Sequence, residues 1–246
     1  MPAPLLRVRD LTVRHWSNPD PVLAHVRFDL RSGETLGIVG RSGAGKSTLV
    51  RALVRLLSPR EWLISGSVQF DGIDLLRATE HQLERIRGGR ICLIGQEPEL
   101  ALNPVLSIGT QIEEVLQAHV RYSRRRRESE ARAMLQAVGL ADSRFYSASL
   151  HELSGGERQR AVIAQCLVSK PSILMADEPT SSLDTVTQAE ILRLLLKLKA
   201  SMRLALLIIT HNPALLLEFT GRVLVLSGDR AFETTLHESL AAQRCV

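Results

Sequence analysis

The sequence predicts an α/β fold with a mostly parallel β-sheet, an antiparallel β subdomain and an inserted helical lobe. Short apolar strand-like segments alternate with amphipathic helix-like segments along much of the chain, which is typical of a parallel sheet covered by helices. The first 40 residues instead contain three closely spaced strand patterns, as expected of an antiparallel subdomain. From about residue 97 to residue 155 amphipathic helical segments predominate, and we predict that this stretch is the inserted lobe.

The order of the predicted elements follows from local patterns of apolar and turn residues. Strands are predicted at 5–16, 26–30, 35–39, 65–72, 90–96, 173–176 and 204–210. The strands at 26–30 and 35–39 are expected to form a hairpin-like pair across the turn Arg31–Gly33. Helices are predicted at 48–57, 109–120, 128–140, 156–169, 187–200 and after Asn212. VLVL and RAFE predict a closing hairpin, and the whole chain, 1–246, is expected to form a single domain.

The composition predicts a globular chain without a membrane span of its own. Hydrophobic residues make up 45% and charged residues 23% of the sequence, which excludes extensive disorder. The longest apolar run, Leu204–Ile209, is far shorter than a membrane span, and the N-terminus lacks a secretory signal pattern. The three cysteines, Cys92, Cys166 and Cys245, are widely spaced and form no metal or disulfide pattern, which fits a reducing cytoplasm.

The charge of the chain permits an acidic partner. The formal net charge is +5 and the isoelectric point is near 9.5, although much of the excess comes from scattered arginines. The densest basic run is Arg124–Arg127, for which a solvated helix face is the first interpretation. Contact with anionic headgroups or with nucleic acid is the alternative, and Tyr122 is the single aromatic residue beside the run.

GRSGAGKS at 40–47 predicts a phosphate-binding loop between a strand and a helix. Glycines let consecutive backbone N–H groups turn inward around phosphate oxygens, and the start of the helix adds a partial positive charge. Lys46 should reach the β- and γ-phosphates, and Ser47 should ligate Mg²⁺. The predicted nucleotide-contacting residues here are Gly40, Arg41, Ser42, Gly43, Ala44, Gly45, Lys46, Ser47 and Thr48.

Two adjacent carboxylates end the apolar strand in PSILMADEP. Burial of a carboxylate is unfavourable without a cation or hydrogen bonds, so this strand end should face a charged ligand. Asp177 fits a residue that holds Mg²⁺ through its water shell, and Glu178 fits the base that orients the attacking water. Gly40, Gln96, Asp177 and His211 all lie at or just beyond predicted strand ends, which predicts one site at one sheet edge.

The stretches LSGGE, SSLD and ITH complete a larger pattern with the phosphate loop, Gln96 and LMADEP. In this order and at these separations, the set resembles the nucleotide-binding subunit of an ABC transporter, a phosphate-loop NTPase fold, over essentially the whole chain. LSGGE, followed by RQR, is the most specific part, because general phosphate-loop ATPases lack it. GQEPELALNP, IRGGRI and DTVTQAEIL are similar to the ATPases of peptide and nickel importers.

The resemblance implies roles for further residues. Gln96 would sense the γ-phosphate and Mg²⁺ and relay their presence to the helical lobe, and His211 would hold the water and Glu178 in place. Asn212 stands where the family usually has aspartate after this histidine. An aromatic residue near the first strand would stack on adenine, and we assign this role to Trp16, with His15 as the alternative.

The resemblance also implies that a second subunit completes the site. The signature residues Ser154, Gly155, Gly156 and Glu157 would contact the nucleotide held by the partner's phosphate loop, which explains why they include no lysine. Asp184 in SSLD would lie at the seam between the two subunits.

The leading hypothesis is an ATPase subunit, using ATP and Mg²⁺, that powers solute import through closure of an ATP-bound dimer. Its expected partners are membrane-spanning permease subunits, a second ATP-binding subunit, identical or paralogous, and indirectly an extracytoplasmic solute-binding protein. The expected location is peripheral, on the cytoplasmic face of the cell membrane. A soluble ABC-type ATPase that acts on nucleic acid or ribosomes is the alternative, but such proteins usually carry tandem nucleotide domains or coiled-coil insertions, which this chain lacks. A non-catalytic regulatory binder is disfavoured by Glu178 and His211.

Overall fold

The structure, a computed structural model, describes residues 3–181, 183–210, 216, 219–228 and 230–236. The described residues fall into two compact units, one within 1–83 and 205–246 and the other within 84–204, and each unit is described by itself. None of the helices within the described ranges is both long enough and apolar enough to cross a membrane.

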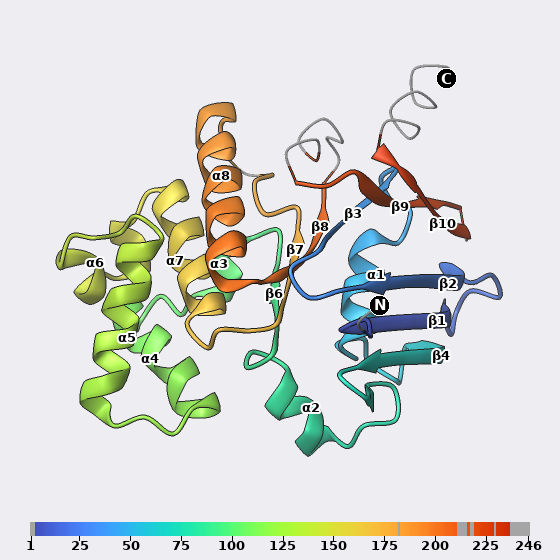
Figure 1. Ribbon diagram of the computed structural model, residues 1–246, viewed down its shortest axis with the longest axis horizontal. Coiled ribbons are helices and arrows are strands. Elements are labelled where there is room, and N and C mark those ends of the chain that lie inside the picture. The colour runs from blue at the N-terminus through green and yellow to red at the C-terminus, as the bar shows by residue number, and fades with distance from the viewer. Residues whose placement is uncertain (1–2, 182, 211–215, 217–218, 229, 237–246) are drawn as a thin grey trace. The chain divides into compact units, whose positions relative to one another are not determined.

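The first unit contains an antiparallel sheet in the strand order β2-β1-β4-β5 (Figure 1). These strands are β1 (Leu6–His15), β2 (Leu23–Leu30), β4 (Trp62–Phe70) and β5 (Ile73–Asp74). Alternate residues of β1 and β2 are buried, so one face of this sheet packs on a core that includes Leu6, Val8 and Phe70. The predicted antiparallel subdomain is therefore confirmed.

The first unit also contains parallel strands, and these carry the phosphate loop. β3 (Thr35–Gly40) pairs in parallel with both β8 (Ala205–Ile209) and β9 (Arg222–Ser227). β9 and β10 (Arg230–Thr235) form the predicted closing hairpin. Helix α1 (Lys46–Leu53) follows β3, and it buries Leu49, Val50 and Leu53.

The predicted pairing of the strands at 26–30 and 35–39 is wrong. β2 pairs with β1 in the antiparallel sheet, whereas β3 lies between two parallel neighbours. The reason lies in their burial. Five of the six β3 residues are buried, and a strand buried on both faces belongs inside a parallel sheet, whereas β2 alternates and exposes one face.

The second unit combines a parallel strand pair with helices. β6 (Ile91–Ile94) and β7 (Ile173–Asp177) pair in parallel. The helices are α2 (Glu80–Ile86), which begins in the first unit, α3 (Pro98–Ala101), α4 (Ile108–His119), α5 (Arg124–Ala137), α6 (Arg144–Ser147), α7 (Gly155–Leu167) and α8 (Thr185–Met202), with a 3₁₀ turn at Leu150–Glu152. Helices α3 to α6 occupy the stretch predicted as the helical lobe, and α7 and α8 lie side by side (Figure 1).

The helix starts of the second unit follow simple capping rules. Ser107, Ser123, Ser154 and Asp184 are N-caps whose side chains accept hydrogen bonds from backbone N–H groups of the first helical turn. Two of these caps, Ser107 and Ser154, lie two residues before the predicted helix starts at 109 and 156, whereas Asp184 lies three residues and Ser123 five residues before the predicted start. Local sequence thus determines where these helices begin.

Candidate functional site

The phosphate loop runs from the end of β3 into the start of α1. Gly40 must be glycine, because a Cβ there would lie 2.6 Å from the backbone oxygen of Leu226 on β9. Gly45 occupies the N-cap position of α1 with a φ of 86°, a left-handed conformation that favours glycine. No side chain accepts a hydrogen bond from the backbone N–H groups at this helix start. The amide-rich loop and the uncapped start of α1 therefore have the chemistry of an anion site.

Lys46 lies within this loop. Its side chain is 7% exposed, and Nζ donates hydrogen bonds to the carbonyl oxygens of Gly40 (3.0 Å) and Arg41 (3.1 Å). An ammonium group carries three N–H donors, so the two carbonyls leave one donor for a further acceptor. The loop's own backbone holds the ammonium group at the loop, as the assignment to phosphate binding requires.

The two predicted carboxylates follow β7 as expected. Asp177 is the last residue of β7 and is 3% exposed, and Glu178 comes next and is partly exposed. Glu178 has a φ of 48°, and its carbonyl oxygen accepts a hydrogen bond from the Ser181 N–H (3.2 Å). Left-handed backbone is unfavourable for a residue with a Cβ, and such strain is concentrated at functional sites.

The other two strand-end predictions have different outcomes. Gln96 is exposed and lies two residues beyond the end of β6, in the same unit as Asp177 and Glu178. His211 and Asn212 lie outside the described residues. The shared site of Gly40, Gln96, Asp177 and His211 stays a prediction, since Gly40 belongs to the first unit.

The signature stretch forms the start of α7. Ser154 is the N-cap, its Oγ accepts from the Glu157 N–H (3.3 Å), and Glu157 Oε2 accepts from the Ser154 N–H (2.8 Å). This reciprocal pair is a capping box. The hydrogen bond from the Ser154 backbone lowers the pKa of Glu157, so its carboxylate is charged at neutral pH. In the described structure no hydrogen bond engages the N–H groups of Gly155 and Gly156.

Asp184 caps α8 beside the signature. Its Oδ1 accepts from the N–H groups of Val186 and Thr187, and its Oδ2 accepts from the Thr187 hydroxyl (2.7 Å). These bonds, with the Thr187 hydroxyl foremost, lower the pKa of Asp184. A cavity of about 410 Å³ opens between the two helix starts. It is lined by Ser154, Gly155, Gly156, Glu157, Arg160, Leu183, Asp184, Thr187 and Glu190.

The sequence predictions did not include Thr187, although it joins the two stretches. Its hydroxyl binds Asp184, and its Cγ2 would lie 2.8 Å from a Cβ added at Gly156. A threonine three residues after a capping aspartate was the available signal for the first contact. The second contact depends on how α7 packs against α8, which the sequence pattern does not reveal.

We expect Gly156→Ala to disturb the packing of α7 against Thr187 of α8, and we expect Gly155→Ala to be tolerated. A Cβ at Gly155 would meet its nearest atom, Leu183 Cδ2, at an ordinary 3.5 Å, whereas the Gly156 variant overpacks against Thr187. The free energy of unfolding in urea should therefore be lower for Gly156→Ala than for Gly155→Ala by about 1–3 kcal/mol. Adding Thr187→Ser removes Cγ2 but keeps the hydroxyl, so it should restore most of the loss. Equal stability of the two alanine variants would contradict this packing.

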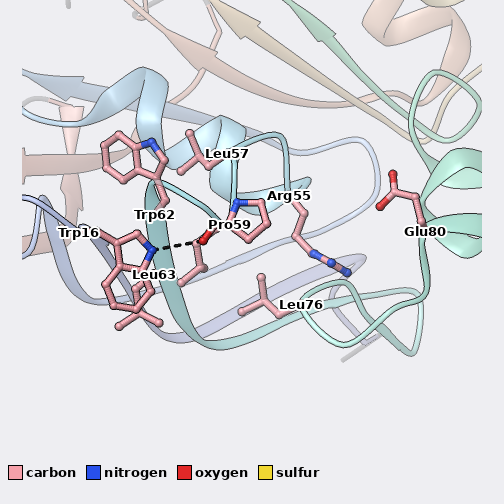
Figure 2. A pocket seen from close by; sticks show the side chains of 9 residues that line it. Trp16, Arg55, Leu57, Pro59, Trp62, Leu63, Leu76 and Glu80 are labelled. Atoms are coloured by element: carbon pink, nitrogen blue, oxygen red, sulfur yellow. Dashed lines mark hydrogen bonds between the residues drawn. The ribbon is translucent and has the colours of Figure 1, made fainter.

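Trp16, the predicted adenine-stacking residue, lies just after β1 and is 53% exposed. Figure 2 shows its indole N–H directed at the Pro59 carbonyl oxygen, 3.2 Å away. The ring borders a cavity of about 350 Å³, which is lined by Trp16, Arg55, Leu57, Pro59, Trp62, Leu63, Ile64, Leu76 and Glu80. His15, the alternative, packs edge-on against Trp62 with ring centroids 4.9 Å apart. The choice between Trp16 and His15 stays a prediction.

Comparison with known protein families identifies the chain. Residues 23–181, which include the phosphate loop, Gln96, the signature and Asp177–Glu178, match the ABC transporter family. The chain belongs to the ABC transporter family. It is an ATPase that binds ATP, and in this family ATP hydrolysis is coupled to transport.

Its relatives include ATP-binding proteins of peptide transporters. A probable peptide ABC transporter ATP-binding protein of Sinorhizobium fredii is 43% identical over 234 residues, which are 93% of this chain and 70% of the relative. The oligopeptide transport ATP-binding protein OppD of Escherichia coli is 41% identical over 233 residues, 93% of this chain and 68% of the relative.

Solved structures confirm the phosphate-loop NTPase fold of an ABC cassette. The ATP-binding cassette MJ0796, solved as a dimer in a post-hydrolysis state with ADP and Pi, superimposes with a TM-score of 0.80 at 28% identity, covering 94% of this chain and 98% of the cassette. The cbiO1 protein of Clostridium perfringens has the same fold, with a TM-score of 0.82 at 23% identity over 99% of this chain and 93% of cbiO1.

Proposed function

We propose that this ABC transporter ATPase powers the import of peptides or of a similar small solute, with nickel as the other cargo class. The observation that carries the proposal is the pair of incomplete phosphate sites in one chain. The first is the loop with Lys46, and the second is the capped start of α7, where the N–H groups of Gly155 and Gly156 have no intramolecular partner in the described structure. The named peptide transport relatives support the choice of cargo.

The two incomplete sites complement each other chemically. Lys46 and the amides of the loop would hold the phosphates of ATP from one side, and the start of α7 would present uncapped amides of a second subunit from the other. Asp184 borders the same cavity as the signature, so it would lie where two subunits meet. The relative MJ0796, solved as a dimer, supports this arrangement. ATP would thus close two subunits face to face, identical or paralogous, and hydrolysis would let them part.

Mg²⁺ fits the residues that the sequence assigns to it. Ser47, Gln96 and Asp177 offer hydroxyl, amide and carboxylate oxygens, which are the donors that Mg²⁺ prefers. The burial of the Asp177 carboxylate, at 3% exposure, suits a residue that faces a cation. When bound, the ion would neutralise phosphate charge. Glu178 would accept a proton from the attacking water, and His211 and Gln96 would orient it.

The proposal places the chain at the cytoplasmic face of the cell membrane, where it would pair with permease subunits. A solute-binding protein outside the membrane would deliver the cargo to those subunits and would affect this chain only indirectly. Trp16 would stack on the adenine ring, with His15 as the alternative. The described helices include none that could span the membrane, so the permease would supply the crossing.

Ser154→Arg is the variant that tests the proposal, in vesicles that contain this chain with its co-purified permease subunits. A bulky cation at the signature should leave ATP binding to the isolated chain unchanged, because the phosphate loop is untouched. It should abolish both ATP hydrolysis and peptide uptake, because the second subunit can no longer close on the nucleotide. Phosphate release and uptake of a labelled peptide measure the two effects.

Ser149→Arg is the matched control. Ser149 lies five residues before Ser154 and forms the same kind of capping box, with Glu152. Both variants therefore lose a helix cap that contributes about 1 kcal/mol to the stability of the chain. Only the Ser154 variant should stop hydrolysis. Full hydrolysis by Ser154→Arg would contradict the two-subunit site, and uptake of nickel in place of peptide would redirect the cargo assignment.

A further inference from the structure

The arginines at and just before the start of α5 fall into two sets, one whose side chains have partners within the lobe and one whose side chains have none. Arg126 and Arg127 belong to the first set. The guanidinium of Arg126 lies 3.9 Å from the centre of the Tyr122 ring, and Arg127 Nη1 donates to the Tyr122 carbonyl oxygen (2.9 Å). Arg121, Arg124 and Arg125, here called the outer arginines, are exposed, and no hydrogen bond, ion pair or ring contact of their side chains is found within the described part of the chain.

Nearby carboxylates do not neutralise the outer arginines, because other groups engage them. Glu113 accepts from the Tyr146 hydroxyl and lies 4.0 Å from Arg127 Nε. Glu128 is held by Arg132 (2.9 Å). Glu130 lies 3.9 Å from Arg126 Nε and 3.3 Å from Lys170 Nζ.

The position of these arginines is unfavourable for the helix itself. Cations near the start of a helix meet the positive end of its dipole, and the first turn of α5 contains no acidic residue that would offset them. The interpretation of the run as a merely solvated face therefore leaves the unfavourable placement unexplained. A negatively charged surface outside the chain would remove the repulsion among the outer arginines and would be attracted by them.

We propose that the outer arginines, Arg121, Arg124 and Arg125, bind the phosphate headgroups of anionic phospholipids. The proposal rests on the proposed function, which places the chain at a membrane. Anionic lipid is favoured over nucleic acid because the guanidinium of Arg126 already covers one face of the Tyr122 ring, the single aromatic ring beside the run on which a base could stack. Three arginines also provide fewer phosphate contacts than stable binding along a nucleic acid uses.

Sedimentation with lipid vesicles tests the proposal directly. The full chain, without nucleotide, should bind vesicles that contain phosphatidylglycerol and should not bind pure phosphatidylcholine. The variant Arg121→Gln/Arg124→Gln/Arg125→Gln should bind the anionic vesicles about 100-fold more weakly, at about fivefold per arginine near a charged membrane surface. Added salt should weaken the binding of the unchanged chain more than that of the variant.

The variant Arg31→Gln/Arg51→Gln/Arg60→Gln is the matched control. These arginines are exposed and lie in the first unit. Replacing them lowers the formal net charge from +5 to +2, as the outer-arginine variant also does. The control should keep the vesicle affinity of the unchanged chain. An equal loss in both variants would attribute binding to net charge and overturn the proposal, as would equal binding to both kinds of vesicle.

Two further measurements separate this proposal from its competitors. Tight binding of a labelled single-stranded oligonucleotide that only the outer-arginine variant loses, with vesicle binding unchanged, would overturn it in favour of nucleic acid. Basal ATP hydrolysis should be the same in the outer-arginine variant and the unchanged chain, because none of the three residues belongs to the phosphate sites. Failure of the proposed function would appear in peptide uptake and in the hydrolysis by Ser154→Arg, and not in vesicle binding, so the two proposals can fail separately.

Discussion

Replacing Glu178 with glutamine is expected to slow ATP turnover by about 100-fold or more while ATP binding persists. Glutamine keeps the size and the hydrogen-bonding reach of the side chain but cannot accept a proton from the attacking water. The backbone should be unaffected, because glutamine has the same branching at Cβ as glutamate and the Ser181 N–H binds the backbone oxygen of residue 178, which the substitution keeps. Phosphate release at saturating ATP measures turnover, and size-exclusion chromatography should detect an ATP-trapped dimer.

Asp71→Asn is the matched control for Glu178→Gln. Asp71 is also an acidic residue with a left-handed backbone, at a φ of 47°, but it lies in an exposed turn of the first unit. This variant should hydrolyse ATP like the unchanged chain. Normal turnover by Glu178→Gln would remove Glu178 from the reaction, whereas loss of turnover in both variants would point to general damage.

Lys46→Ala is expected to weaken ATP binding by about 10- to 100-fold, the range of a hydrogen bond to a charged group. The ammonium group is held at the loop by the carbonyl oxygens of Gly40 and Arg41, so its removal deletes the positive charge that the loop presents to phosphate. Anisotropy of a fluorescent ATP analogue measures the affinity, and circular dichroism checks that the chain is folded.

Two companion variants make the Lys46 result interpretable. Lys46→Met keeps the buried aliphatic stem, so it should match Lys46→Ala in affinity while folding better. Arg51→Met removes an exposed cation from the last turn of the same helix and should leave ATP affinity unchanged. Near-normal affinity of both Lys46 variants would refute the assignment of GRSGAGKS to phosphate binding.

Much of the fold and of the candidate site could be predicted because the signals are local. The strand that ends at Gly40 and the strand that ends at Asp177 were recognisable from short apolar runs, since a buried strand contains few polar residues. The start of α7 was recognisable from a serine and a glutamate three residues apart, since a capping box is formed by one turn of helix.

The errors and omissions concern contacts between residues distant in the sequence. The strands at 26–30 and 35–39 are adjacent in the sequence, yet each pairs with different partners, because burial on two faces requires neighbours that come from elsewhere in the chain. Thr187 was missed for the same reason. Its contact with Gly156 exists only when α7 and α8 pack together.

The sequence by itself determined the family, the phosphate loop, the paired carboxylates and the lysine-free signature, because each is a chemical pattern within a few consecutive residues. Only the tertiary structure decided that Asp184 and the signature border one cavity, and that Arg126 and Arg127 are engaged while the outer arginines are not. The physical reason is that capping and backbone conformation act over one turn of chain, whereas burial and charge neutralisation depend on which distant side chains the fold brings within reach.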